Sequence, residues 1–599
     1  MAQKIRLVVS YLLCIVVFVF VFQFILADHI SLKWPDMRYT LLVCLAIASF
    51  VNLYKHPRDV AISLFVPAAL SAAIAPKLLF LSKDVKIFGN MIWSELGFFL
   101  FAYLLINLLH YLLYNFLKYR KSVAVFITIL KIILTMYPIT FISYFIAIRD
   151  ILDTVSVIAV YQTNIQESKE FLLGIISPSI AILIIVTAVI VSWLFWQSTR
   201  SVEFHSLGQR KCSTLVVFIL LWLTPLKITD CYVKKIVDNS QEYLQSVRNF
   251  RSYRYNSDGT PKIIPATTSL SGDNQTFILV LGESQARDHM NAYGYKRNTT
   301  PWLTPKRLDP NFIFFENAYS SHTLTMKVLS MALTEANQYN KRDFAETYSI
   351  IDIAKAAGFK TVWLSNQAKY GNFSTPTTVI SDMCDQQIWV NTEADFSNKF
   401  DEYLLKYLPE LPKQGRNLVV IHLSGSHYEY KDRYPDEYRK FDNSDDLPLT
   451  DIKSVQKVNE YDNSVLYTDY VLSKIYEYAE SNKNVAGIMY LSDHGEDAFA
   501  DNKHIVGLFR FRMSRIPLFI YLSSEYQRNN KDILNNLLHN RQMYFSNDFV
   551  YDTILNILKI DQKFYEPYNS LASDKYNYQP SDLTTLNGQI KLSDDNKKE

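Results

Sequence analysis

The stretch "FILVLGESQARDHMNAYGY", residues 277–295, begins as an apolar run and becomes polar within a few positions. Its first residues predict a buried strand, because short continuous apolar runs are typical of sheets covered on both faces. Glu283 follows Gly282 at the end of this strand. A carboxylate adds nothing to a hydrophobic core, so its place at a strand tip indicates ligand binding. We therefore expect Glu283 to bind a divalent metal ion.

The chain around this strand has two halves of different composition. Of its 599 residues, 49% are hydrophobic and 20% are charged, but long apolar runs dominate up to about residue 230. Beyond about residue 270 the sequence is mixed and tyrosine-rich, as in an ordinary soluble domain. The net charge of +3 gives no indication of nucleic-acid binding. Cys384 is the single cysteine of the later half, which therefore cannot form an internal disulfide.

The first half predicts a multi-pass membrane domain, because about 20 apolar residues suffice for a spanning helix. Seven apolar runs are candidates, at 7–27, 38–54, 60–81, 91–116, 122–147, 171–197 and 213–230. Lysines and arginines cluster before the first run and in alternate loops, which predicts that these segments face the cytoplasm. An odd number of spans then places the second half across the membrane, which is the periplasm if the cell is Gram-negative.

The sequence divides into four parts on this interpretation. We expect a transmembrane domain of about seven helices over 1–232, a polar linker over 233–273, a catalytic domain over 274–575 and a polar, disordered tail over 576–599. The polar segment "VYQTNIQESKEFL" before the sixth run includes Thr163 and Glu167. It is either a solvated connector or a surface that holds a lipid headgroup.

Apolar runs in the second half alternate with helical patterns, which predicts an α/β sandwich with a largely parallel sheet. Ligands collect at the carboxyl ends of such strands. Polar residues follow four of these runs. Glu283 follows the first, Gln367 and Lys369 the second, His427 the third, and Asp493 and His494 the fourth. Taken singly, a histidine or an Asp-His turn is more often structural. Together, carboxylates and imidazoles suit Zn²⁺ or Mn²⁺, and His504 in "DNKHIVG" joins the set as a weaker candidate.

The segment "AYSSHTLTMKVLSMALT", residues 318–334, predicts a polar turn that leads into a helix, with Thr325 near the helix start. Thr323 or Thr325 could simply cap this helix. A helix N-terminus also stabilises phosphate, and a hydroxyl bound to a metal loses its proton more readily and can attack phosphorus. The remaining histidines of this half are interpreted as structural: His289, His322, His422 and His539.

The run "GESQARDHMNAYGYKRNTTPWL" resembles the signature of membrane-bound phosphoethanolamine transferases, whose catalytic domain is alkaline-phosphatase/sulfatase-like. "WLSNQ", "YDNSVLYTD" and "SDHGE" follow in the family's order, over roughly residues 275–570. The resemblance implies a first zinc ion held by Glu283, Thr325, Asp493 and His494, with Thr325 also the nucleophile. It implies substrate contacts or a second metal ion for the residues His427, His504, Lys369, Gln367, Thr163 and Glu167.

The implied reaction moves phosphoethanolamine from phosphatidylethanolamine to lipopolysaccharide, at a core sugar or lipid A, or to another envelope glycan, through a phospho-threonine. Lipid A-modifying members carry soluble-domain disulfides and a cysteine near the nucleophile, where this chain has Ser321 and His322. It therefore looks closer to members that modify core sugars or other glycans.

Three alternatives stay open at this point. A phosphoglycerol transferase of the lipoteichoic acid type shares the threonine and the metal. A sulfatase requires a Cys or Ser in a C/S-x-P-x-R context, which the sequence lacks. A non-catalytic membrane scaffold predicts lost ligands, whereas every expected ligand type is present.

Overall fold

The computed structural model describes residues 105–148, 178–223, 232–369, 375–392, 399–443, 452–500 and 509–595, with a few isolated positions besides. The chain divides into two compact units, and the division falls between Gln241 and Glu242. This point lies inside helix α13 (Tyr232–Ser252), so a continuous helix occupies the first part of the segment expected to be a linker.

The described part of the first unit is helical, with α7 (Arg120–Ile148), α10 (Pro178–Ser201) and α11 (Lys211–Leu223). One described helix, Arg120–Phe145 with a mean hydropathy of 2.1, has the length and composition to cross a membrane. It coincides with the span expected at 122–147. The expected spans at 7–27 and 60–81 lie outside the described residues and most others lie partly outside, so the seven-span topology stays a prediction.

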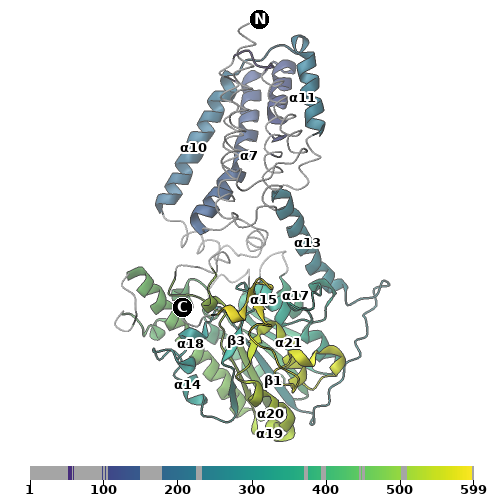
Figure 1. Ribbon diagram of the computed structural model, residues 1–599, viewed down its shortest axis with the longest axis vertical. Helices are drawn as coiled ribbons and strands as arrows, with labels where there is room; N and C mark the ends of the chain where they lie inside the picture. The colour runs from purple at the N-terminus through teal and green to yellow at the C-terminus, as the bar shows by residue number, and fades with distance from the viewer. Residues whose placement is uncertain are drawn as a thin grey trace. The chain divides into compact units, whose positions relative to one another are not determined.

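A seven-stranded sheet forms the centre of the second unit (Figure 1). Its strands, in spatial order, are β2 (Phe312–Phe314), β8 (Leu518–Leu522), β7 (Val485–Ser492), β1 (Gln275–Gly282), β6 (Arg416–His422), β4 (Lys360–Lys369) and β5 (Gln386–Thr392). Strands β7, β1, β6, β4 and β5 are parallel, and β8 runs antiparallel to both of its neighbours. The four strands expected from the sequence are neighbours, which confirms the largely parallel α/β sheet.

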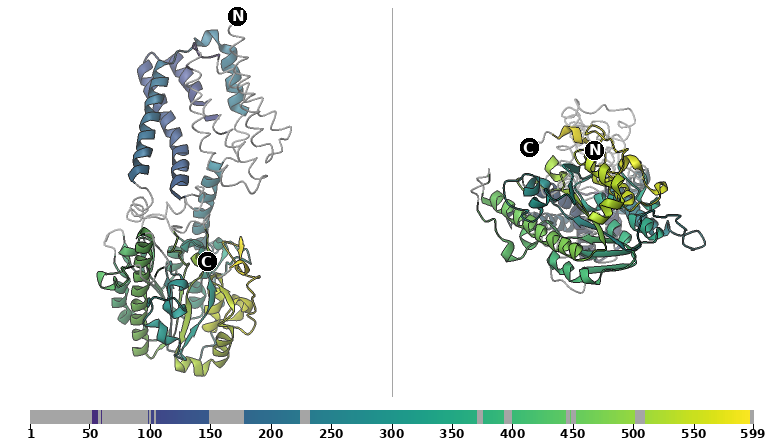
Figure 2. Two further views of the ribbon diagram at one scale, coloured as in Figure 1. Left: turned by 60° about the vertical axis from the view of Figure 1, so that its left-hand side comes forward. Right: turned by 90° about the horizontal axis from the view of Figure 1, so that it is seen from below.

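Helices cover both faces of this sheet, as Figures 1 and 2 show. On β1, Leu279 and Leu281 belong to a core shared with α15 (Thr325–Ala332), α16 (Ile350–Ala356) and α21 (Val550–Ile557). Ile278 and Val280 point to the other face, into a core shared with α18 (Ile452–Ser481). The alternation explains why β1 is continuously apolar from Phe277 to Leu281: side chains on both faces are buried.

Shorter elements complete the second unit. They are α14 (Leu303–Lys306), α17 (Pro376–Ser381), α19 (Ser524–Asn529), α20 (Lys531–Asn540), β3 (Asn317–Tyr319), β9 (Tyr544–Ser546), β10 (Thr584–Thr585) and β11 (Ile590–Lys591). Strand β3 pairs in parallel with β9, and β10 pairs with β11 as a small hairpin.

The register of the parallel strands brings their carboxyl ends to one edge. Leu281 pairs with His422 on β6, and Gly282 pairs with Ser492 on β7. Ser365 on β4 pairs with the same His422. The residues that follow these positions are therefore level with one another, as ligand-binding α/β folds require.

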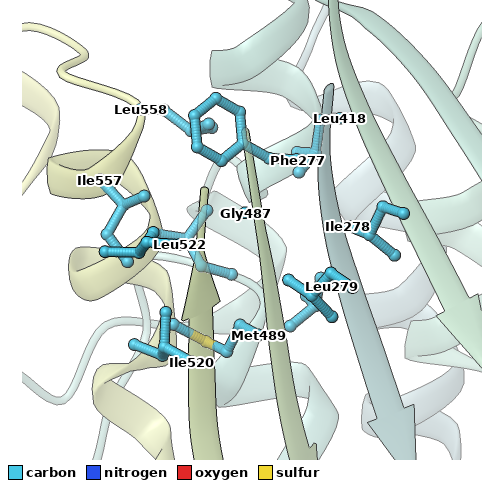
Figure 3. Close-up of a pocket in the computed structure, with 12 residues that line it drawn as sticks. Phe277, Ile278, Leu279, Leu418, Gly487, Met489, Ile520, Leu522, Ile557 and Leu558 are labelled. Atoms are coloured by element: carbon cyan, nitrogen blue, oxygen red, sulfur yellow. The ribbon is translucent and has the colours of Figure 1, made fainter. Parts of the chain in front are cut away.

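A small apolar cavity lies between the sheet and α21, lined by residues of β1, β6, β7, β8 and α21 (Figure 3). Phe277, Leu279, Met489, Leu522 and Ile557 are among its lining residues. The sticks in Figure 3 show carbon and one sulfur atom only, so this cavity offers no ligand to a metal ion or phosphate. The polar side chains lie instead beyond the carboxyl ends of the parallel strands.

The expectation that residues 576–599 are disordered is wrong for 576–595, while 596–599 lie outside the described residues. Leu583 and Leu592 are buried in the core next to the β10–β11 hairpin. The Asp595 carboxylate is buried against the Arg515 guanidinium, with 1% of its side chain exposed. The prediction relied on the polar average composition of the tail. A few buried side chains are enough to order the tail, and an average composition does not reveal them.

Candidate metal centre and nucleophile

Three buried side chains meet at the carboxyl ends of the adjacent strands β1 and β7. Glu283, Asp493 and His494 each offer one ligand atom, and these atoms lie within 4.8 Å of one another. The His494 Nε2 atom is 3.6 Å from a Glu283 oxygen and 3.4 Å from Asp493 Oδ2. Glu283 and Asp493 are each 1% exposed. The structure thus brings together three of the four residues expected to hold one cation.

Thr325, the fourth, is the first residue of α15 and presents its hydroxyl to this group. Its Oγ1 is 3.2 Å from each oxygen of Glu283 and 3.5 Å from His494 Nε2. Leu324 is the N-cap, and no side chain caps the helix. The Thr323 hydroxyl is buried and has no hydrogen-bond partner in the part of the chain that the structure describes. The capping interpretation therefore applies to neither threonine.

The charges of this group fit a divalent cation. Burial, and next the nearby Asp493 carboxylate, raise the pKa of Glu283 well above its usual range. Asp493 Oδ2 is buried with no hydrogen-bond donor among the described residues. The Nδ1 atom of His494 donates to the Gly495 carbonyl at 3.0 Å, which leaves the Nε2 lone pair directed at the carboxylates. A dication would offset the cost of burying these carboxylates together.

The backbone around Glu283 is shaped to hold both carboxylates. Ser284 has a positive φ of 59°, a strained conformation for serine. In this conformation its N–H donates to Asp493 Oδ1 at 2.9 Å, and its hydroxyl donates to Glu283 Oε1 at 2.8 Å. The His494 N–H also donates to Asp493 Oδ1, at 2.7 Å. One oxygen of Asp493 is thus held by backbone, and the other stays available as a ligand.

The loop after β6 packs directly on the backbone of Glu283. Gly425 has a φ of +52°, and a Cβ there would lie 2.7 Å from the Glu283 carbonyl oxygen, so glycine is required. The Ser426 N–H donates to the same oxygen at 2.9 Å. His427 follows on this loop, with Nδ1 donating to the Tyr428 carbonyl at 3.0 Å. The structure therefore places the His427 loop beside Glu283.

Of the two residues expected from the tip of β4, only one contacts the ligand group. Gln367 Nε2 is 3.4 Å from a Glu283 oxygen and donates to the Leu423 carbonyl at 2.8 Å. Lys369 instead donates to Asp382 at 2.9 Å and to Gln387 at 2.7 Å, and none of its described contacts reaches the ligand group.

Three further candidates, His504, Thr163 and Glu167, lie outside the described residues. The roles expected for them from the resemblance therefore stay predictions.

Asn547 is a residue of the site that the sequence did not predict. It is fully buried at the start of a short 3-10 helix (Asn547–Phe549). Its Oδ1 accepts from the Ser321 N–H at 2.9 Å, and its Nδ2 donates to the Asp493 carbonyl at 2.6 Å. One amide thus joins the segment before the nucleophile to the backbone of a metal ligand. An isolated asparagine in "YFSNDF" gives no such signal in the sequence.

We expect Asn547→Leu to destabilise the protein by about 2–4 kcal/mol, because it leaves the Ser321 N–H and the Asp493 carbonyl buried without partners. We also expect it to lower the bound metal per chain. Chemical denaturation and elemental analysis measure the two effects.

The matched control is Asn540→Leu, since Asn540 is equally buried and donates to the carbonyls of Leu571 and Ser573. This variant should lose comparable stability and keep its metal. Equal metal content in both variants would contradict the role of Asn547 at the site.

Comparisons with known proteins identify the family. The sulfatase family model matches residues 275–560. Phosphoethanolamine transferase EptC of Escherichia coli K12 is 28% identical over 414 residues, which cover 64% of this chain and 71% of that protein. A Haemophilus influenzae protein named "Putative phosphoethanolamine transferase" is 30% identical over 362 residues, covering 58% and 69%. The chain belongs to the phosphoethanolamine transferase family.

Solved structures agree with the fold of this transferase. The C-terminal periplasmic domain of E. coli EptC in complex with Zn is 27% identical, with a TM-score of 0.51, and covers 56% of this chain and 97% of that one. The integral membrane phosphoethanolamine transferase EptA of Neisseria meningitidis has a TM-score of 0.58 over 85% of this chain and 98% of that one, at 18% identity. The second half of the transferase therefore has the expected alkaline-phosphatase/sulfatase-like fold.

Proposed function

We propose that this transferase moves phosphoethanolamine from phosphatidylethanolamine to lipopolysaccharide or another envelope glycan, with Thr325 as the covalent nucleophile. One observation carries the proposal: the Thr325 hydroxyl lies 3.2 Å from both oxygens of Glu283, within the Glu283–Asp493–His494 group. The names of the relatives EptC and EptA support phosphoethanolamine as the transferred group. The name of the N. meningitidis protein, which includes lipooligosaccharide, supports a glycolipid of this type as the acceptor.

Glu283, Asp493 and His494, together with the Thr325 hydroxyl, would hold the metal. Carboxylate, imidazole and hydroxyl donors suit Zn²⁺, with Mn²⁺ as the second choice, and His427 and His504 would serve a second ion or the substrate phosphate. When bound, a dication supplies Lewis acidity and neutralises charge that develops on phosphate oxygens.

The reaction follows from the place of Thr325. Its Oγ1 forms a bond to the phosphorus of the lipid, and the bond from phosphorus to the diacylglycerol oxygen breaks. That oxygen takes up a proton and diacylglycerol leaves. An acceptor hydroxyl or phosphate then bonds to phosphorus, the Thr325–phosphorus bond breaks and Thr325 regains its proton. Before the first step the Thr325 hydroxyl donates hydrogen bonds to the Glu283 oxygens. Its proton leaves as the bond to phosphorus forms, which balances the proton that the diacylglycerol oxygen takes up. The N-terminus of α15, which begins at Thr325, would favour the transferred anion.

The donor is a lipid, so the site has to work close to a bilayer. We propose that residues 1–232 form a multi-pass domain in a bacterial inner membrane and that residues 274–575 form the catalytic domain in the periplasm. The apolar helix Arg120–Phe145 supports a membrane segment, and the name of the EptC domain, C-terminal and periplasmic, supports the compartment. Thr163 and Glu167 would contact the lipid headgroup.

Labelled lipids test the proposal in cells with and without this chain. Label in the ethanolamine of phosphatidylethanolamine is expected to appear on lipopolysaccharide or another glycan only when the chain is present. Transfer of glycerol label instead would favour a phosphoglycerol transferase, and release of free phosphoethanolamine alone would favour a hydrolase. Transfer of neither label would support a non-catalytic scaffold, although the convergence of all four ligand residues argues against one.

A further inference from the structure

Ser320 and Ser321 lie just before Thr325, in residues 318–326, which we call the nucleophile segment. The N–H and carbonyl groups of both serines are all hydrogen-bonded. Two of these four partners come from the C-terminal end of the chain. The Ser320 N–H donates to the Ser514 carbonyl at 2.7 Å, and the Ser321 N–H donates to Asn547. These two bonds fix one side of the segment to the body of the domain. Thr325 follows only four residues after Ser321.

The C-terminal residues hold the other side. The Thr585 hydroxyl donates to the Ser320 carbonyl at 2.8 Å, and the Asn587 N–H donates to the Ser321 carbonyl at 3.3 Å. Thr585 is fully buried. Figure 1 shows the yellow C-terminal ribbon next to α15, the helix that starts at Thr325.

The turn that presents these donors is strained. Leu586, Asn587 and Gly588 have consecutive positive φ values of 52°, 54° and 87°. Two of the three are not glycine, so the conformation carries a cost that the surrounding contacts have to offset. Strain of this kind is concentrated where a backbone has to reach a defined partner, here the Ser321 carbonyl.

A buried ion pair anchors the end of the same segment. The Arg515 guanidinium donates to both oxygens of Asp595. The Tyr319 hydroxyl donates to Asp595 Oδ2 at 2.7 Å, one residue before Ser320. Three consecutive residues ahead of the nucleophile, Tyr319 to Ser321, are thus each bonded to the C-terminal end of the chain.

We propose that residues 583–595 are a positioning strap that fixes the segment carrying Thr325 against the metal ligands. Asn547 and Ser514 accept from the N–H groups of Ser320 and Ser321, and the strap donates to their carbonyl groups. The segment can therefore shift only if at least one of these hydrogen bonds breaks. A nucleophile displaced by a fraction of an ångström loses much of its rate, because attack needs close alignment with phosphorus. The expected effect of the strap on kcat rests on the proposed function, whereas the hydrogen bonds of the strap do not depend on it.

Thr585→Val tests the strap, because it replaces the donating hydroxyl by a methyl group of the same shape. Thr585→Ser keeps the donor and is the rescue variant. Thr584→Val is the matched control, since the adjacent Thr584 hydroxyl donates to the Gln338 side chain at 3.3 Å instead of to the nucleophile segment. All variants are made in the full-length chain in detergent or lipid.

Two measurements are combined, and one of them needs no activity. Amide hydrogen exchange of residues 318–326 is expected to become roughly threefold to tenfold faster in Thr585→Val, and to stay at the wild-type rate in the other two variants. The kcat for phosphoethanolamine transfer is expected to fall at least about tenfold in Thr585→Val alone, with KM and bound zinc unchanged.

The outcomes separate the two proposals. Wild-type exchange in Thr585→Val would overturn the strap, and so would faster exchange with an unchanged kcat. If Thr584→Val raised the exchange rate and lowered kcat as much as Thr585→Val, residues 583–595 would only stabilise the domain in general, and the positioning role would be wrong. A wild-type chain that transfers nothing would contradict the proposed function, and the exchange measurement would then decide by itself whether the strap holds the segment.

Discussion

Thr325→Ala is expected to abolish transfer of phosphoethanolamine and to leave the protein folded. The substitution removes the hydroxyl that lies 3.2 Å from both Glu283 oxygens and that is proposed to bond to phosphorus. Loss of a covalent nucleophile lowers kcat by at least about a thousandfold. Thr325 is only partly buried and caps no helix, so little stability is lost. Mass analysis of the product and thermal unfolding measure the two effects.

Thr323→Val is the matched control for this prediction. Thr323 lies two residues earlier in the same segment, and its buried hydroxyl has no hydrogen-bond partner among the described residues. Replacing that hydroxyl by a methyl group should leave kcat close to the wild-type value. Full activity in Thr325→Ala, or an equal loss in Thr323→Val, would remove Thr325 from its proposed role.

Asp493→Asn is expected to release the metal while the fold persists. The asparagine carbonyl can still accept from the N–H groups of Ser284 and His494, as Asp493 Oδ1 does. The amide nitrogen takes the place of Oδ2, which has no hydrogen-bond donor among the described residues, and it cannot act as a metal ligand. Loss of a residue that only hydrogen-bonds to a metal ligand lowers the affinity for the metal roughly ten- to a hundredfold, and loss of a direct ligand should lower it further. Competition with a chelator measures the change.

Asp497→Asn is the control for the metal prediction. Asp497 is as buried as Asp493, but its oxygens lie 3.6 Å from the guanidinium groups of Arg510 and Arg512 and outside the ligand group. This variant should lose stability and retain its bound metal. If Asp493→Asn binds zinc as tightly as Asp497→Asn, the assignment of Asp493 as a ligand is wrong.

The sequence predicted the part of the site that depends on strand register. Glu283, Asp493 and His494 each follow an apolar run directly, and parallel pairing of β1 with β7 makes the ends of these runs level. Because side chains at level tips of neighbouring strands are close, spacing along each run was enough to group them. Thr325 needed the family resemblance, since a threonine before a helix looks the same whether it caps or reacts.

The rest of the site depends on contacts between segments far apart in the sequence. Asn547 meets Ser321 across 226 residues, and Thr585 meets Ser320 across 265, so no local pattern indicates either pair. Lys369 lies apart from the ligand group for a different reason. The pairing of β4 with β5 shifts register between Ser365 and Ala368, which breaks the simple alternation of faces, and the Lys369 ammonium binds Asp382 instead of facing the site.

Mapping the covalent intermediate tests the central claim most directly. The full-length protein is mixed with phosphatidylethanolamine, quenched in acid before acceptor is added, and digested with trypsin, which releases residues 308–327 as one peptide. We predict that this peptide carries an ethanolamine phosphate group and that its fragments place the group on Thr325. A group located on Thr323 or on another peptide, or an unmodified protein that still transfers the headgroup, would contradict the account.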